Sequence, residues 1–215
     1  MTQSRRPYRR ESEVARREAL ITAALELVAE GGSASATVRA IAQRAGVTPG
    51  LIRHYFLSKD ELIRAAYGHL MEQMNRDNMA VLETAQDCPV NRLTAFVVAS
   101  LRPPVVDPLR LGLWAGFIHG VRKDEAMRTA HAKGYHDYRD VLQNLIAALP
   151  RQARPETLRA EAIACNAVID GLWLEGSALP QDFSPGELER IGLTSVGAIL
   201  GIDLSAALPP IGETS

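Results

Sequence analysis

The sequence predicts an all-α protein, with a three-helix N-terminal domain followed by a larger helical C-terminal domain. Aromatic residues make up only 5% of the 215 residues, and no alternation of β-branched and polar residues is sustained. Apolar residues instead recur at helical spacing along most of the chain. They make up 47% of it, which is enough for a substantial core and excludes a wholly disordered chain.

The first helix is expected over residues 12–30. Five apolar residues share one of its faces, namely Leu20, Ile21, Ala24, Leu25 and Val28, and Gly31-Gly32 follows as a stop signal. The preceding residues 1–11 are rich in arginine and carry no apolar face. We therefore expect a flexible basic arm there.

Two short helices come next. Thr37 can cap a helix over residues 38–45 that Gly46 ends, and Thr48 can cap a second helix that reaches residue 56. Pro49 then occupies the favoured first position of the second helix. A helix, a glycine-containing turn and a second helix at this spacing indicate a helix-turn-helix, whose second helix can enter the major groove of DNA.

The second of these helices has distinct inner and outer faces. At about 100° per residue, Ile52 and Phe56 share the inner face, whereas Gly50, Arg53 and His54 share the outer face. An arginine can make a bidentate contact with guanine, a histidine can bond a base or a phosphate, and glycine permits close approach of the backbone. We therefore expect this outer face to contact the bases of DNA.

The flanks of this face carry hydroxyl, cationic and helix-start groups that suit phosphate oxygens. They are Thr37, Arg39, Thr48, Pro49, Tyr55 and Lys59. The alternative is a solvated helix face with a structural tyrosine and a lysine at a helix start. The combination of these residues favours DNA binding over that alternative.

A long helix and several proline-bounded helices follow. The capping box Ser58-Lys59-Asp60-Glu61 opens a helix of about 25 residues that runs towards Pro89. Prolines then bound helices near residues 90–101, 108–121, 124–148, 156–178 and 186–200. These patterns predict domains at residues 12–57 and 58–203, with a flexible tail over residues 204–215.

Charge and cysteine content narrow the classes of function. The net charge is -1, but residues 1–64 hold 11 basic and 7 acidic side chains, whereas the rest of the chain holds 13 and 18. A basic head and an acidic body are expected.

The two cysteines, Cys88 and Cys165, exclude a disulfide framework, and His131 and His136 are poorly spaced for a metal site, so no cofactor is expected. No signal peptide or apolar run of membrane length is present, so we expect a soluble cytoplasmic protein without a membrane partner.

Four segments closely resemble the DNA-binding domain of TetR-family transcriptional repressors. They run from Ala19 to Val28, Thr37 to Ala42, Ala45 to Ile52 and His54 to Leu62. Within that family the segments Gly50 to Phe56 and Ile169 to Leu174 are similar to the BetI type, the choline-responsive regulators of glycine-betaine synthesis. Arg53 departs from the pattern, because most relatives carry tyrosine there and BetI-like relatives a small polar residue. The operator sequence therefore cannot be inferred from the family.

The resemblance implies that the body forms a homodimer and binds a small-molecule effector, and that the protein represses transcription from a palindromic operator. The residues agree with dimerisation, since the segments 156–178 and 188–200 are apolar on more than one side. Helices of this kind need two partners, one of which can belong to a second copy of the chain.

The richest aromatic and acidic set in the body is the candidate effector site. It comprises Trp114, Phe117, Asn166, Asp170 and Trp173. Aromatic faces with a carboxylate suit an organic cation such as choline. The alternative is that both tryptophans are core residues and Asp170 satisfies a helix end or a contact between chains. Tyr135, His136 and Tyr138 could equally line the site or merely cover the body.

Motifs of common enzyme classes are absent from the sequence. It contains no G-x-S-x-G, P-loop, G-x-G-x-x-G or H-E-x-x-H motif, so we do not expect an enzyme. The expected partners are double-stranded operator DNA, a second copy of the chain and an effector of unknown identity. A helical adaptor or scaffold without specific DNA binding is the alternative function.

Overall fold

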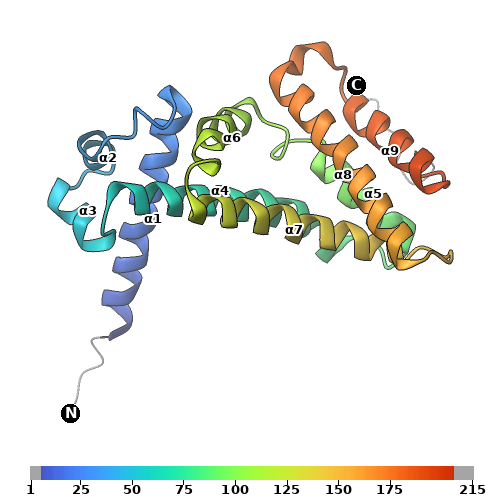
Figure 1. Cartoon of the computed structure of the whole chain (residues 1–215), viewed down its shortest axis with the longest axis horizontal. Helices are drawn as coiled ribbons and strands as arrows, with labels where there is room; N and C mark the ends of the chain where they lie inside the picture. The colour runs from blue at the N-terminus through green and yellow to red at the C-terminus, as the bar shows by residue number, and fades with distance from the viewer. Residues whose placement is uncertain (1–5, 206–215) are drawn as a thin grey trace, which may run out of the picture. The chain divides into compact units, whose positions relative to one another are not determined.

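The computed structural model describes the backbone of residues 6–205 and the side chains of residues 13–205. This part of the chain is helical, with no β-strand (Figure 1). The helices are α1 (Arg6–Gly31), α2 (Val38–Arg44), α3 (Pro49–Tyr55), α4 (Lys59–Thr84), α5 (Pro89–Ser100), α6 (Pro108–Val121), α7 (Glu125–Ala147), α8 (Pro155–Ala178), the 3-10 turn η1 (Pro180–Asp182) and α9 (Glu187–Leu200). The predicted all-α fold is confirmed.

The expected helix bounds agree closely with the structure because proline and capping residues set them. Helices α3, α5, α6 and α8 all begin at a proline, whose fixed φ suits the first turn and whose missing N–H costs nothing there. At the start of α4, Ser58 Oγ accepts a hydrogen bond from the Glu61 N–H at 3.1 Å. The Glu61 carboxylate in turn accepts from the Leu57 N–H at 2.6 Å, which completes the capping box one residue earlier than the usual pattern.

Two expectations at the chain ends were wrong. Helix α1 begins at Arg6 rather than residue 12, so residues 6–11 of the expected flexible arm are helical, while residues 1–5 lie outside the described part. Arginine and glutamate favour helix there, and Pro7 lies in the first turn, where it is tolerated. Leu204, assigned to the flexible tail, is only 1% exposed and belongs to the core, and residues 206–215 are not described.

The chain divides into two compact units that differ from the expected domain bounds. We call Met1–Met71 together with Gly112–His131 the head unit, and Glu72–Leu111 together with Ala132–Ser215 the body unit. The head unit therefore includes most of α6 and the start of α7 as well as the three N-terminal helices. Each unit is described separately below.

The head unit has a core built from every one of its helices. Leu20 and Val28 of α1, Ile41 of α2, Ile52 of α3 and Leu62 of α4 are all almost fully buried. Helix α6 approaches α1 closely at Gly116, where an added Cβ would lie 2.8 Å from Val28 Cγ1. The glycine is therefore needed for this close packing.

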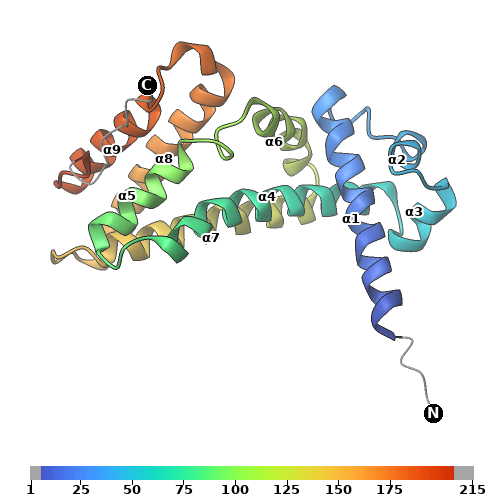
Figure 2. The ribbon, with the colours of Figure 1, turned by 180° about the vertical axis from the view of Figure 1, so that it is seen from behind.

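The body unit is built around α5, which is buried on most of its surface. Helix α5 lies behind α8 in Figure 1 and in front of it in Figure 2, and α9 runs beside α8 in both views. The core of the body unit includes Phe96 of α5, Leu142 of α7, Ile169 of α8 and Val196 of α9. Helix α9 packs closely against the end of α5 at Gly192, where an added Cβ would lie 2.1 Å from Cδ1 of Leu101, the residue that follows α5.

Candidate DNA-binding surface and effector site

The turn between α2 and α3 has the geometry that the sequence predicts, with one exception. Thr37 Oγ1 caps α2 by accepting a hydrogen bond from the Ala40 N–H at 3.1 Å. Gly46 follows α2 with φ of 66°, a left-handed conformation that favours glycine and ends the helix. Thr48 occupies the N-cap position of α3, but its side chain makes no capping bond. Thr48 therefore takes the predicted N-cap position, but the expected side-chain bond is not formed.

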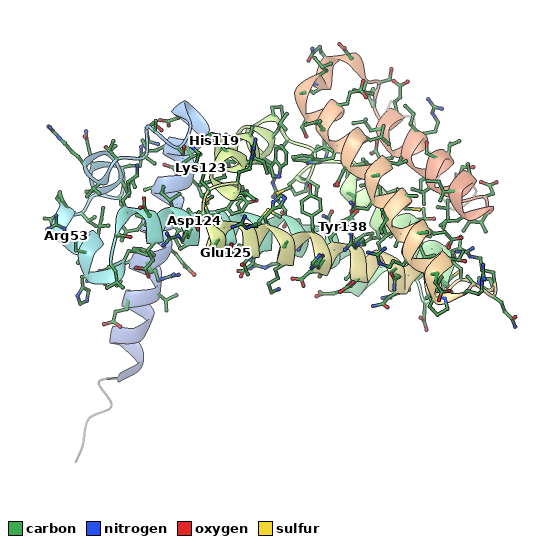
Figure 3. The ribbon with its side chains drawn as sticks, viewed as in Figure 1. Arg53, His119, Lys123, Asp124, Glu125 and Tyr138 are labelled. Atoms are coloured by element: carbon green, nitrogen blue, oxygen red, sulfur yellow. The ribbon has the colours of Figure 1, made fainter. Side chains whose placement is uncertain are left out.

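Helix α3 separates its inner and outer residues as predicted. Ile52 is 2% exposed and Phe56 is 1% exposed, whereas Gly50, Arg53 and His54 are exposed to solvent. Figure 3 shows Arg53 on the outer side of α3. The buried pair fixes the rotation of the helix about its axis, so the arginine and histidine face outward with their donors available.

The predicted phosphate-contacting residues are all at least partly exposed. Thr37, Arg39, Thr48 and Pro49 are exposed, while Tyr55 and Lys59 are half-buried. The rings of His54 and Tyr55 meet edge to face at 5.0 Å between centroids. Together with Gly50, Arg53 and His54, these residues occupy one continuous stretch from the start of α2 to the start of α4.

Two arginines of the head unit link the helices of the helix-turn-helix to one another, and neither role was predicted from the sequence. Arg44 of α2 pairs with Glu26 at 3.1 Å and with Glu30 at 2.7 Å, both on α1. Arg17 of α1 places its guanidinium 5.0 Å from the centre of the Phe56 ring. Neither contact leaves a signal in the local sequence, because each joins residues that are far apart in the chain. These exposed ion pairs contribute orientation more than stability.

In the body unit, Asp170 and Asn166 form the acidic part of the candidate effector site. Asn166 Nδ2 donates a hydrogen bond to Asp170 Oδ2 at 2.9 Å, one turn along α8. Burial raises the pKa of Asp170 to about 6, although the bond from Asn166 acts in the opposite direction. The carboxyl group is therefore costly to ionise in this position.

The charge of Asp170 acts on two tyrosines of α7. It adds to the effect of burial in raising the pKa of both Tyr135 and Tyr138. The Tyr138 hydroxyl lies 2.9 Å from Ser100 Oγ of α5, and its ring packs 4.9 Å from Phe96. Figure 3 labels Tyr138 on α7. The site therefore combines a carboxyl group from α8 with phenol groups from α7.

Trp173 has a structural role beside this site. Its indole Nε1 donates to the Val105 carbonyl at 2.9 Å, and the ring is only 9% exposed. One turn further on, Ser177 Oγ accepts from the Asp107 N–H at 3.2 Å. These two bonds attach the segment that connects α5 with α6 to helix α8. Trp173 therefore agrees with the alternative that it is a core residue.

The five candidate effector residues are divided between the two units. Trp114 and Phe117 belong to the head unit, whereas Asn166, Asp170 and Trp173 belong to the body unit. Phe117 is 1% exposed and packs against the Tyr67 ring at 5.3 Å, which also fits a core role. Within the body unit, the structure joins Asn166 to Asp170 and adds Tyr135 and Tyr138 to the set.

The remaining features of the described residues concern metal ligands, the buried cysteine and the apolar character of the helices. Among them, no group of three or more His, Cys, Asp or Glu side chains is arranged to hold a metal ion. Burial raises the pKa of the Cys165 thiol to about 12, which makes it a poor nucleophile. None of the described helices combines the length and apolar character needed to cross a membrane.

Two family models match the chain, one over each functional region. Residues 20–66 match the model described as "Bacterial regulatory proteins, tetR family". Residues 89–201 match the model described as "BetI-type transcriptional repressor, C-terminal". The first match covers the helix-turn-helix and the second covers helices α5 to α9.

Individual relatives and solved structures agree with these matches. The HTH-type transcriptional regulator BetI of Stenotrophomonas maltophilia is 32% identical over 181 residues, which cover 83% of this chain and 90% of that protein. A solved structure of a protein from Pseudomonas aeruginosa PAO1 is 30% identical, with a TM-score of 0.79 over 90% of this chain and 93% of that one. A crystal structure from Saccharomonospora viridis that contains choline shares the fold, with a TM-score of 0.70 and 19% identity over 83% of this chain and 94% of that one.

Proposed function

Because this chain belongs to the TetR family of bacterial transcriptional regulators and has a BetI-type C-terminal domain, we propose that it is a transcriptional repressor. We propose further that a small organic cation releases it from DNA. In this proposal it binds a palindromic operator as a homodimer. The main support for DNA binding is the exposed face of α3. The burial of Ile52 and Phe56 on the opposite face turns this face towards solvent.

We assign base contacts to the outer face of α3 and phosphate contacts to its flanks. Arg53 and His54 supply donors to base edges, and Gly50 allows the backbone to come close. The phosphate contacts come from Thr37, Arg39, Thr48, Tyr55 and Lys59, with Pro49 setting the start of the helix. The free hydroxyl of Thr48, which makes no capping bond, supports this assignment.

Dimerisation through α8 and α9 would bury apolar groups that the single chain leaves in contact with solvent. Leu174 of α8 is 47% exposed, and Leu172, Ile191 and Ile199 are half-buried. Pairing these two helices with their copies in a second chain gives a four-helix bundle. Such a dimer would present two copies of α3 to the two halves of a palindrome.

We propose a small organic cation, with choline as the first compound to test, as the effector. The Asp170 carboxyl group lies near two phenol groups, and aromatic faces with a carboxylate are suited to quaternary ammonium ions. The choline-containing relative from Saccharomonospora viridis supports this choice. The contacts of Trp173 and Phe117 described above favour core roles, so we assign the effector to the Asp170, Asn166, Tyr135 and Tyr138 group.

The proposed function is tested by selection of operator sequences. The purified protein is incubated with random duplex DNA, and the bound fraction is amplified and sequenced over several rounds. We expect a palindromic motif whose half-sites are centred about one or two helical turns apart, and we expect choline to release it. A selection that enriches no motif, together with an absence of duplex binding at every salt concentration, would favour the adaptor function instead.

A further inference from the structure

One arginine of α1 is held against the end of α3. The guanidinium of Arg17 lies over the Phe56 ring, with 5.0 Å between Cζ and the ring centre, which is within the range of a cation–π contact. Phe56 is the residue that ends α3 and is only 1% exposed, so the core of the head unit fixes its ring. Arg17 itself is exposed. The contact therefore holds a positive charge of α1 at the surface, beside the turn that joins α3 to α4.

The hydrogen-bond donors of Arg17 are not used within the described part of the chain. Arg44, the other arginine that links these helices, is neutralised by Glu26 and Glu30. Among the described residues, the Arg17 guanidinium forms no ion pair and no hydrogen bond, and it contacts the Phe56 ring. A guanidinium carries five N–H donors, and contact with an aromatic face pairs none of them with an acceptor oxygen. Planar donors of this kind suit a phosphate group.

The turn beside Arg17 carries two of the proposed phosphate contacts. Tyr55 directly precedes Phe56, and Lys59 begins α4 three residues after it. Between them, Leu57 is 93% exposed, so this turn projects into solvent. Arg17 therefore brings a third group, from a different helix, to the segment that we expect to lie along the DNA backbone.

We propose that Arg17 contacts a phosphate of the operator and that Phe56 is the platform that holds its guanidinium in place. This inference rests on the proposed function, because it adds a contact to the same DNA interface. The ring restricts a long side chain before DNA arrives, which lowers the entropy cost of ordering that side chain on binding. Phosphates are the same in every sequence, so the contact adds affinity without adding sequence preference.

The salt dependence of DNA binding measures this contact. Each phosphate that a protein neutralises contributes about 0.9 to the slope of log affinity against log salt concentration, because condensed counterions are released. The proposed homodimer carries two copies of Arg17, so removal of both charges should reduce the slope by about 1.8. When the salt concentration rises about fourfold, the affinity of such a variant should fall by a factor about ten times smaller than that of the wild-type protein.

The experiment is fluorescence anisotropy of labelled duplexes with the full-length protein over a series of salt concentrations. Arg17→Gln removes the charge, so it should reduce the slope and weaken binding to the selected operator and to random duplex alike. Arg17→Lys keeps a charge at this position and should keep most of the wild-type slope. Arg16→Gln removes the same charge from the neighbouring exposed position, about 100° away around α1, and should keep the wild-type slope.

A purely structural role for Arg17 would have a different signature. Loss of the ring contact alone would lower the melting temperature of Arg17→Gln but leave the slope unchanged, because the slope counts released counterions. An unchanged slope would therefore overturn the phosphate contact while leaving operator binding in place. An equal reduction in the Arg16→Gln variant would overturn the assignment to Arg17 and its platform. Absence of operator binding by the wild-type protein would overturn the proposed function together with this inference.

Discussion

At the level of single residues, the ionised Asp170 side chain lowers the stability of the fold. Its pKa is about 6 in the folded protein, above the usual value of 3.8, so the folded state binds the proton more tightly than the unfolded state. The contribution of this group to stability is therefore most favourable below pH 3.8 and is lost as the pH rises through 6.

We predict that Asp170→Asn raises the free energy of unfolding by about 1–3 kcal/mol at pH 7.5 and leaves it nearly unchanged at pH 4. The asparagine keeps an oxygen that can accept the bond from Asn166. Urea denaturation of both proteins at the two pH values measures the difference. An equal gain at both pH values would show that the effect has a cause other than ionisation.

Arg53 is the residue that we expect to determine base preference. Because it lies on the outer face of α3, Arg53→Ala should weaken binding to the selected operator by about 1–3 kcal/mol, with little change for random duplex. Competition binding assays with both DNAs measure this preference. Arg159→Ala removes the same charge from an exposed position on α8 and serves as the control. An unchanged preference in the Arg53 variant would remove the arginine from base readout.

At the level of secondary-structure elements, two glycines are predicted to respond in opposite ways to alanine. A Cβ at Gly192 would lie 2.1 Å from Leu101 Cδ1, and Leu101 is only 1% exposed. Gly192→Ala should therefore lower the free energy of unfolding by about 1–3 kcal/mol. A Cβ at Gly112 of α6 would have no neighbour within 4 Å, so Gly112→Ala should raise it by up to about 1 kcal/mol. Thermal unfolding compares the two variants, and a destabilised Gly112 variant would contradict this account.

Most of the helices could be predicted from sequence because local signals define them. Proline at the first turn, the Ser58 capping box and Gly46 after α2 act within a few residues, so the bounds of α2 to α9 agree closely with the structure. The start of α1 could not be placed, since arginine and glutamate are compatible with both a helix and a flexible arm. Leu204 was missed because its burial depends on packing against distant residues.

The candidate site was predictable only in part, for a similar reason. Helical periodicity suffices to separate Ile52 from Arg53, so the outer face of α3 could be predicted. Composition alone could not tell a core tryptophan from one that lines a pocket. The bond from Trp173 to the Val105 carbonyl joins residues 68 positions apart, and no pattern near Trp173 reveals it.

At the level of the whole molecule, effector and operator binding should be linked. Helix α4 contributes residues to both the head unit and the body unit, and we expect it to carry the coupling between them. We predict that the effector weakens operator binding by a factor equivalent to about 1–3 kcal/mol, and that operator DNA weakens effector binding by the same factor. Titration of choline into the free and the operator-bound protein measures this factor. Equal affinities in the two titrations would exclude induction by choline.

The composition of the head unit limits how this regulator can be recombined with its relatives. Gly116 of α6 packs on Val28, the Tyr67 hydroxyl lies 2.6 Å from His131 Nδ1, and Arg64 pairs with Asp124 at 2.7 Å. All of these contacts join residues 1–71 to the separate segment 112–131. A hybrid regulator made by exchanging only residues 1–57 would place a foreign surface against Gly116. Residues 112–131 should therefore be transplanted together with the N-terminal helices when a new DNA specificity is grafted onto this body.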